Sequence, residues 1–148
     1  MTQTPPNDNL VGRIFSDRYR LTRKVGEGAM GQVYLARHTF MDKNVAVKVL
    51  HPQLLGHEEV VERFQREAKA AAHIEHPNVC AATDFGRYGE VGLFLVMEWH
   101  DGRSLEEVIT ADGPLPVERA LHIAIQAAEG VQRAHELQIV HRDLKPAN

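Results

Sequence analysis

Three glycines near the start of the chain follow a spacing that suits phosphate binding. Residues 26–31 read GEGAMG, a G-x-G-x-x-G string, in which the missing side chains let backbone N–H groups approach phosphate oxygens closely. The same string opens a helix at dinucleotide sites. Here residues 32–36 alternate as a strand does, so the glycines should join two strands. On this motif alone, a hairpin that binds no ligand remains the alternative.

A lysine lies in the middle of an apolar segment. Residues 45–50 read VAVKVL, and in a strand Ala46, Lys48 and Leu50 share one face. A lysine surrounded by apolar side chains pays a large desolvation penalty unless an anion meets it. We therefore expect Lys48 to bind an anionic group. The alternative is a solvated lysine that protects an edge strand from aggregation.

A carboxylate lies on the apolar stripe of the helix expected over residues 58–74. The stripe consists of Val60, Phe64, Glu67, Ala71 and Ile74. Glu67 is its only charged member, which predicts that Glu67 pairs with Lys48 across elements. The alternative partner is Arg63, one helical turn away.

The elements that must position these residues form two groups. Strand patterns begin near Tyr19 and recur at residues 33–36, 45–50, 79–85 and 93–98. Ser104 and Glu107 have the spacing of a capping box, and a long amphipathic helix is expected over residues 116–137. The fold class is thus α+β, with an antiparallel five-stranded lobe that carries one helix, followed by a helical part.

The order of these motifs, completed by the end of the chain, resembles protein kinases. Residues 141–148 read HRDLKPAN, a string similar to the catalytic loop of eukaryotic-type (Hanks-type) serine/threonine kinases. The wording GEGAMGQVYLAR at residues 26–37 resembles the bacterial branch of that family. The resemblance covers residues 19–148 and implies a protein-kinase-like fold. It divides the chain into a flexible leader (1–16), an N-lobe (17–98), and a hinge with the start of a C-lobe (99–148).

The resemblance also implies roles for individual residues, with ATP and Mg²⁺ as cofactors. Asp143 would accept or orient the proton of a substrate hydroxyl, Lys145 would stabilise the transferring phosphoryl group, and Asn148 would bind magnesium. Lys48 would hold the α- and β-phosphates, oriented by Glu67. The cofactor-binding set it implies is Val25, Gly26, Glu27, Gly28, Ala29, Met30, Gly31, Val33, Ala46, Lys48, Met97, Glu98 and His100.

One three-residue string has the same sequence as the magnesium-binding motif of this family. Asp84, Phe85 and Gly86 spell DFG, but in the family this motif follows the catalytic loop, whereas here it precedes Asp143. We interpret it as the end of a strand that enters a turn, with Gly86 supplying the turn conformation.

The chain ends at Asn148, before the family's metal-binding Asp and activation loop. We therefore expect a fragment of a serine/threonine protein kinase that is inactive alone. Two alternatives are a nucleotide-binding scaffold or pseudokinase-like module, and a related phosphotransferase that acts on small molecules. Lys145 and Pro146 argue against the latter.

Composition restricts the partners. A net charge of -3 without a basic cluster argues against nucleic acid, and we find no apolar run long enough to cross a membrane. The single Cys80 and the lack of a secretory signal indicate a cytoplasmic setting. The expected partners are ATP and protein substrates, and a homodimer remains open.

Overall fold

The computed structural model describes residues 10–89 and 91–148, and the chain divides into two compact units. The sheet unit comprises the described residues up to Ala72 together with Ala82–Trp99. The helical unit comprises His73–Ala81 and His100–Asn148. Each unit is described by itself below.

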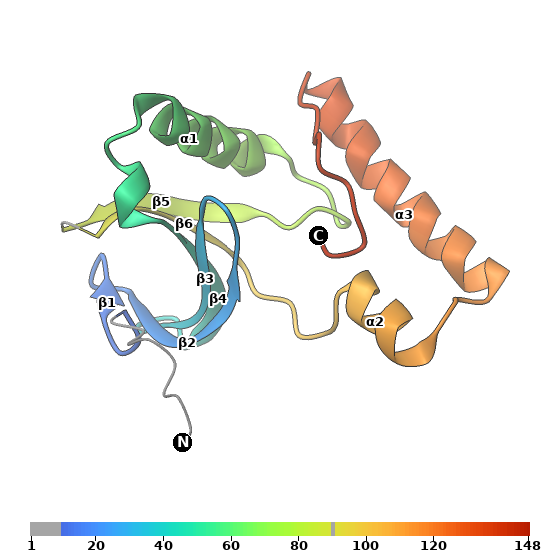
Figure 1. Ribbon diagram of the computed structural model, residues 1–148, viewed down its shortest axis with the longest axis horizontal. Coiled ribbons are helices and arrows are strands. Elements are labelled where there is room, and N and C mark those ends of the chain that lie inside the picture. Colours follow the sequence, from blue (N-terminus) through green and yellow to red (C-terminus); the bar gives the residue numbers. More distant parts are fainter. Residues whose placement is uncertain (1–9, 90) are drawn as a thin grey trace. The chain divides into compact units, whose positions relative to one another are not determined.

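The sheet unit contains one antiparallel sheet of six strands, in the order β1-β2-β3-β4-β6-β5 (Figure 1). The strands are β1 (Ile14–Phe15), β2 (Tyr19–Glu27), β3 (Gly31–His38), β4 (Lys43–Leu50), β5 (Ala82–Tyr88) and β6 (Gly92–Glu98). The predicted antiparallel sheet with one helix is confirmed, but with six strands where five were predicted, because β1 adds an edge strand.

The edge strand β1 corrects the predicted boundary of the leader. Residues 10–16 were expected to be loose, yet Phe15 is fully buried and its ring stacks on Tyr88 at 4.1 Å between centroids. Large aromatic side chains gain stability by such burial. The sheet therefore begins before Tyr19. Residues 1–9, the rest of the predicted leader, lie outside the described residues.

Two apolar clusters lie on the two faces of β4. Val45, Val47 and Val49 belong to a cluster that includes Phe15, Tyr34, Phe94 and Val96. Leu50 belongs to the other, with Leu93 and Leu95 of β6 and with Phe64 and Ala68 of helix α1 (Glu58–His73). A short 3₁₀ helix, η1 (Pro52–Leu54), leads from β4 toward α1. Since burying one such side chain contributes about 1.5–3 kcal/mol, the second cluster fixes α1 against the sheet.

The helical unit contains α2 (Leu105–Asp112) and α3 (Val117–Glu136). The predicted capping box is confirmed, because the Glu107 N–H donates to the Ser104 hydroxyl at 3.1 Å while the Ser104 N–H donates to the Glu107 carboxylate at 2.7 Å. Gly130 is buried in α3, and a Cβ added there would lie 3.1 Å from the Asn78 carbonyl oxygen. α3 also exposes Val117, Leu121 and Ile125. Within the described part of the chain, no helix is long and apolar enough to span a membrane.

The DFG string has a structural role in β5. The Tyr19 hydroxyl donates to Asp84 Oδ2 at 2.7 Å, and Arg18 Nη2 lies 3.2 Å from the same oxygen. The predicted turn at Gly86 is wrong, because β5 continues to Tyr88. Gly86 instead makes room for an aromatic ring: a Cβ there would lie 2.7 Å from the Phe94 ring. Asp84 thus joins β5 to the start of β2.

The Tyr19 hydroxyl yields a test of this contact. Burial, together with the hydrogen bond to Asp84, raises the pKa of Tyr19 to about 12. We expect Asp84→Asn to lower this pKa toward the ordinary value of about 10, because the acceptor would lose its negative charge. Ultraviolet titration of tyrosinate, with a Tyr19→Phe variant to identify the signal, measures the shift. An unchanged titration curve would contradict the contact.

Gly31, at the start of β3, provides a second test. A Cβ at Gly31 would lie 2.1 Å from the Val49 carbonyl oxygen, whereas a Cβ at Gly28 would meet nothing within 4 Å. We expect Gly31→Ala to lower the free energy of unfolding by about 1–3 kcal/mol, as overpacking does. Gly28→Ala should leave it nearly unchanged. Denaturant unfolding compares the two, and equal effects would show that β3 does not need this close approach.

Candidate functional site

The glycine string forms the turn of the hairpin between β2 and β3. β2 ends at Glu27 and β3 begins at Gly31, and the Gly28 N–H donates to the Gly31 carbonyl at 2.9 Å. A strand therefore follows the last glycine, as predicted. This excludes the arrangement of a dinucleotide site, in which a helix starts at that position.

The strand register brings four predicted site residues close together. Val33 of β3 is paired with Lys48 of β4, and Ala46 of β4 is paired with Met97 of β6. Ala46 and Lys48 share a face of β4 because side chains alternate along a strand. Val25 lies in β2 beside the glycine turn and is partly exposed. The sheet thus places these residues on neighbouring strands near the hairpin.

Lys48 and Glu67 do not form the predicted ion pair. Lys48 Nζ lies 5.9 Å from the centroid of the Phe64 ring. Glu67 Oε1 lies 3.9 Å from Arg63 Nε, with half of the Glu67 side chain exposed. The structure thus forms the alternative pair within α1.

Helical geometry explains this difference. The buried residues of α1 are Phe64 and Ala68. Successive residues are about 100° apart around the helix axis, so Glu67 lies about 60° to one side of Phe64, whereas Ala68 lies to the other side of Phe64. Glu67 is therefore at the edge of the buried face. The apolar stripe runs through position 68, whose small alanine gave little signal in the sequence.

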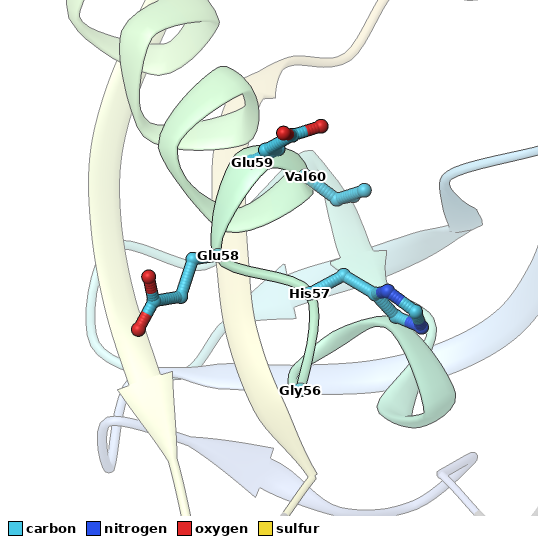
Figure 2. A pocket seen from close by; sticks show the side chains of 5 residues that line it. All are labelled: Gly56, His57, Glu58, Glu59 and Val60. Carbon is cyan, nitrogen blue, oxygen red and sulfur yellow. The ribbon is translucent and has the colours of Figure 1, made fainter.

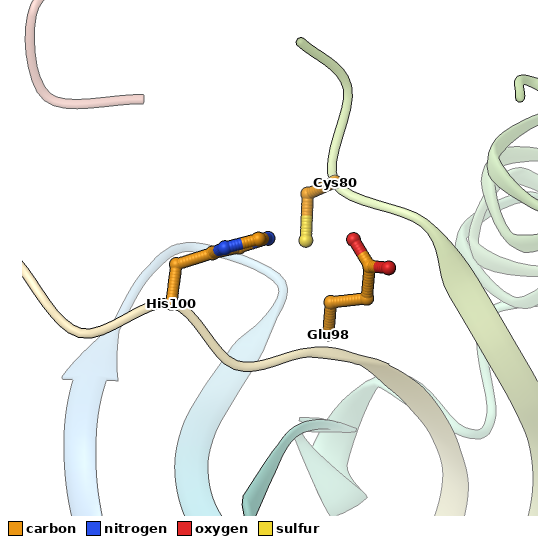
Figure 3. Close-up of side chains that lie close together, drawn as sticks. All are labelled: Cys80, Glu98 and His100. Carbon is orange, nitrogen blue, oxygen red and sulfur yellow. The ribbon is translucent and has the colours of Figure 1, made fainter. Parts of the chain in front are cut away.

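Glu98 ends β6, and Trp99 and His100 follow it directly. The Arg23 guanidinium lies 5.8 Å from the centroid of the Trp99 ring, within the sheet unit. In the helical unit, metal-ligating atoms of Cys80 and His100 lie within 4.8 Å of each other (Figure 3). Two ligands do not make a structural zinc site, which requires four. Glu98, also drawn there, belongs to the sheet unit. The proximity of Cys80 to His100 was not predicted from the sequence.

The end of the helical unit brings Asp143, Lys145 and Asn148 together. Lys145 Nζ lies 3.0 Å from Asp143 Oδ2. The Asn148 amide nitrogen donates to the Asp143 carbonyl at 2.7 Å and to Asp143 Oδ2 at 3.1 Å. The Asp143 N–H donates to His141 Nδ1 at 3.2 Å. A carboxylate, a cation and an amide thus form one compact cluster.

Backbone contacts hold this loop in place. The Asn148 N–H donates to the Lys145 carbonyl at 3.0 Å, and the Glu106 N–H of α2 donates to the Pro146 carbonyl at 2.9 Å. Arg142 has a φ of 65°, a left-handed conformation uncommon for residues other than glycine. The sequence string HRDLKPAN did not reveal this backbone conformation, which turns the chain immediately before Asp143.

The polar neighbours of Asp143 favour its ionised form. Hydrogen bonds from Lys145 and then from Asn148 hold the pKa of the Asp143 carboxyl below its ordinary value. Both donors favour the ionised form. Asp143 therefore stays negatively charged at neutral pH.

A separate hollow lies at the start of α1 (Figure 2). It has a volume of about 420 Å³ and is lined by residues 56–60, including the carboxylates Glu58 and Glu59. The predicted site residues do not line it. Two carboxylates would repel a phosphate, so this hollow is not a candidate for the predicted nucleotide site.

Comparison with known proteins agrees with the motifs. The family model described as protein kinase domain matches residues 19–148. The serine/threonine-protein kinase pkn3 of Myxococcus xanthus is 41% identical over 146 residues, which cover 99% of this chain and 27% of that relative. Serine/threonine-protein kinase PrkC of Bacillus subtilis is 41% identical over 139 residues, which cover 94% of this chain and 21% of that relative.

A solved structure extends the agreement to the fold. The PknI kinase domain of Mycobacterium tuberculosis matches with a TM-score of 0.78 and 34% identity, over 93% of this chain and 55% of that one. The chain thus spans about a quarter of the curated relatives it matches and about half of that solved domain. From its motifs, its fold and these matches, the chain belongs to the protein kinase domain family, in the bacterial Hanks-type serine/threonine branch.

Proposed function

We propose that the chain contributes the nucleotide-binding and catalytic-loop parts of a serine/threonine protein kinase, which transfers the γ-phosphoryl group of ATP to protein hydroxyls. The observation that carries this proposal is the cluster of Asp143, Lys145 and Asn148. These residues lie in a chain that matches the kinase family from residue 19 to residue 148.

Asp143 is assigned to the substrate hydroxyl. Its carboxylate is two-thirds exposed, with a side-chain exposure of 66%, and is ionised at neutral pH. An ionised carboxylate accepts a hydrogen bond from a hydroxyl and so points the hydroxyl oxygen at the phosphorus atom. As the new P–O bond forms and the bond to ADP breaks, the hydroxyl proton moves toward Asp143 Oδ.

Lys145 and Asn148 are assigned to charge neutralisation. Lys145 Nζ lies beside Asp143, where a cation offsets charge on a transferred phosphoryl group. Both hydrogen bonds of Asn148 to Asp143 use the amide nitrogen, which leaves the Asn148 carbonyl oxygen Oδ1 as a ligand atom. Magnesium prefers such oxygen ligands, so Asn148 fits the role of magnesium ligand. The bound ion would neutralise phosphate charge during transfer.

The sheet unit is assigned to the nucleotide. The proposed phosphate contacts are the backbone of residues 26–31 and the Lys48 ammonium, whose neighbours in β3 and β6 are Val33 and Leu95. Val25, Val33, Ala46 and Met97 supply apolar surface for the adenine base, and the backbone of Glu98 supplies its polar edge. Pairing of Glu67 with Lys48 would require Glu67 to leave Arg63, a surface ion pair that contributes about 0–1 kcal/mol.

Replacement of Asp143 tests the catalytic assignment. We expect Asp143→Asn to lower phosphate incorporation into a protein substrate about 10²–10⁴-fold, the usual contribution of acid–base catalysis. The assay uses radiolabelled ATP with magnesium and compares this chain, which we expect to be inactive alone, with the longer chain that the reading frame encodes past Asn148, in which the variants are measured. Asp112→Asn is the matched control, since it removes another exposed carboxylate, which pairs with Arg103 at 3.1 Å and lies outside the cluster of Asp143.

The outcomes of this assay separate the proposal from the scaffold alternative. Labelling that Asp143→Asn abolishes and Asp112→Asn preserves supports a kinase. If wild-type protein binds ATP but neither length of chain transfers phosphate, the nucleotide-binding scaffold takes its place. Equal labelling by wild type and Asp143→Asn would show that Asp143 is not catalytic.

Replacement of Lys145 tests the electrostatics of the cluster without an activity assay. The hydrogen bond from Lys145 is the largest cause of the lowered pKa of Asp143. We therefore expect Lys145→Gln to raise the pKa of Asp143, because the ionised form loses its cationic partner. Carboxyl carbon NMR over pH 2–6 (about the range in which aspartates titrate) follows this shift. A pKa of Asp143 that is unchanged or lower would contradict the cluster.

A further inference from the structure

His51 contacts the glycine hairpin from the neighbouring strand. It follows β4 directly, and its backbone N–H donates to the Met30 carbonyl at 2.9 Å. Its ring nitrogen Nε2 lies 2.9 Å from the Gly28 carbonyl oxygen. Since a carbonyl oxygen only accepts, Nε2 must carry the hydrogen in this contact. One residue outside the glycine string thus binds two of its carbonyl groups.

The contact with Gly28 also sets the direction of an N–H group. The chain has no cis peptide bond among its described residues. In a planar trans peptide, the carbonyl of one residue and the N–H of the next point in opposite directions. A Gly28 carbonyl directed at His51 therefore directs the Ala29 N–H away from His51. Without the ring, this peptide could rotate, because Gly28 has no side chain that restricts it.

The stem of the hairpin is held separately. Glu27 receives contacts from the Lys24 ammonium and from Gln32 Nε2, the latter at 3.3 Å. The Tyr34 hydroxyl donates in turn to Gln32 Oε1 at 2.7 Å. These side chains fix Glu27 and Gln32 but not the peptides between them. The turn itself depends on His51 and on the bond from Gly28 to Gly31.

We propose that His51 is a positioning residue for nucleotide binding: its ring holds the Gly28 carbonyl and thereby presents the Ala29 N–H to a nucleotide phosphate. This inference rests on the proposed function, because it takes the glycine turn as the phosphate-binding loop. The ligand class is a nucleoside triphosphate or diphosphate, whose phosphate oxygens accept from backbone N–H groups. His51 itself touches the loop and not the nucleotide.

Two substitutions separate the hydrogen bond from the bulk of the ring. His51→Phe keeps a ring of similar size without a donor, whereas His51→Gln carries an amide nitrogen with similar reach. Both keep the backbone bond to Met30. His57→Phe is the control, an exposed histidine in the turn before α1. Each variant is first compared with wild type by denaturant unfolding.

Two measurements then test the proposal. Amide hydrogen exchange at Gly28 reports opening of the turn, independently of any ligand. Titration with magnesium and a fluorescent ATP analogue reports the dissociation constant. In His51→Phe we expect faster exchange at Gly28 and a dissociation constant about two- to tenfold higher, the range for one neutral hydrogen bond. For His51→Gln and His57→Phe, we expect the exchange rate at Gly28 and the dissociation constant to stay near the wild-type values.

The readouts distinguish failure of the inference from failure of the proposed function. Unchanged exchange at Gly28 in His51→Phe overturns the role of the ring in holding the turn, whatever the ligand. Faster exchange with an unchanged dissociation constant overturns the role in nucleotide binding and leaves the proposed function intact. If wild type binds no nucleotide, the proposed function and the inference fail together, while the exchange data still establish whether His51 holds the turn.

Discussion

The sheet unit depends on a strand that is bonded on both edges and packed on both faces. β4 pairs with β3 on one side and with β6 on the other. Its odd-numbered valines belong to one apolar cluster, and Leu50 belongs to the cluster that includes α1. A strand in this position cannot shift register by one residue without moving every side chain to the opposite face. Lys48 is thereby fixed on the same face as Ala46 and Leu50.

This constraint explains how one face can hold both an apolar anchor and a cation. The even-numbered side chains of β4 meet α1 through Leu50, while Lys48 reaches the ring of Phe64 on the same helix. An ammonium group over an aromatic ring gains about 0.5–2 kcal/mol, which partly offsets its desolvation. Packing of α1 therefore determines the surroundings of Lys48 even though Glu67 pairs elsewhere. The position of this lysine is thus a consequence of how the core packs.

Much of the fold could be read from the sequence because its signals are local. Strand alternation identified β4, the capping box identified the start of α2, and prolines marked the start of α3. The misses have a common cause. Phe15 packs on Tyr88, more than seventy positions away in the sequence. Gly86 makes room for Phe94, about eight positions away. Glu67 was placed on the buried stripe because Ala68, the residue actually buried, is too small to mark a face.

In the candidate site, too, the sequence identified the residues but not the contacts between them. The strings at residues 26–31 and 141–148 predicted which residues carry the functional groups of the site, since their spacing is specific. Geometry then added what spacing cannot show: the amide of Asn148 turned toward Asp143, the left-handed Arg142 and the ring of His51 on a glycine carbonyl. Such contacts depend on backbone directions, which one sequence does not encode locally.

The buried Phe15 bears on where this domain should be cut. The family match begins at Tyr19, but Phe15 fills the space between Tyr88 and Phe94, with ring centroids 4.1 Å and 5.2 Å away. A polypeptide expressed from residue 19 onward would leave a cavity there, and loss of a buried phenylalanine typically costs about 3–5 kcal/mol. The folding boundary of this domain thus precedes its homology boundary, and an affinity tag joined directly at Tyr19 would occupy the position of the edge strand β1.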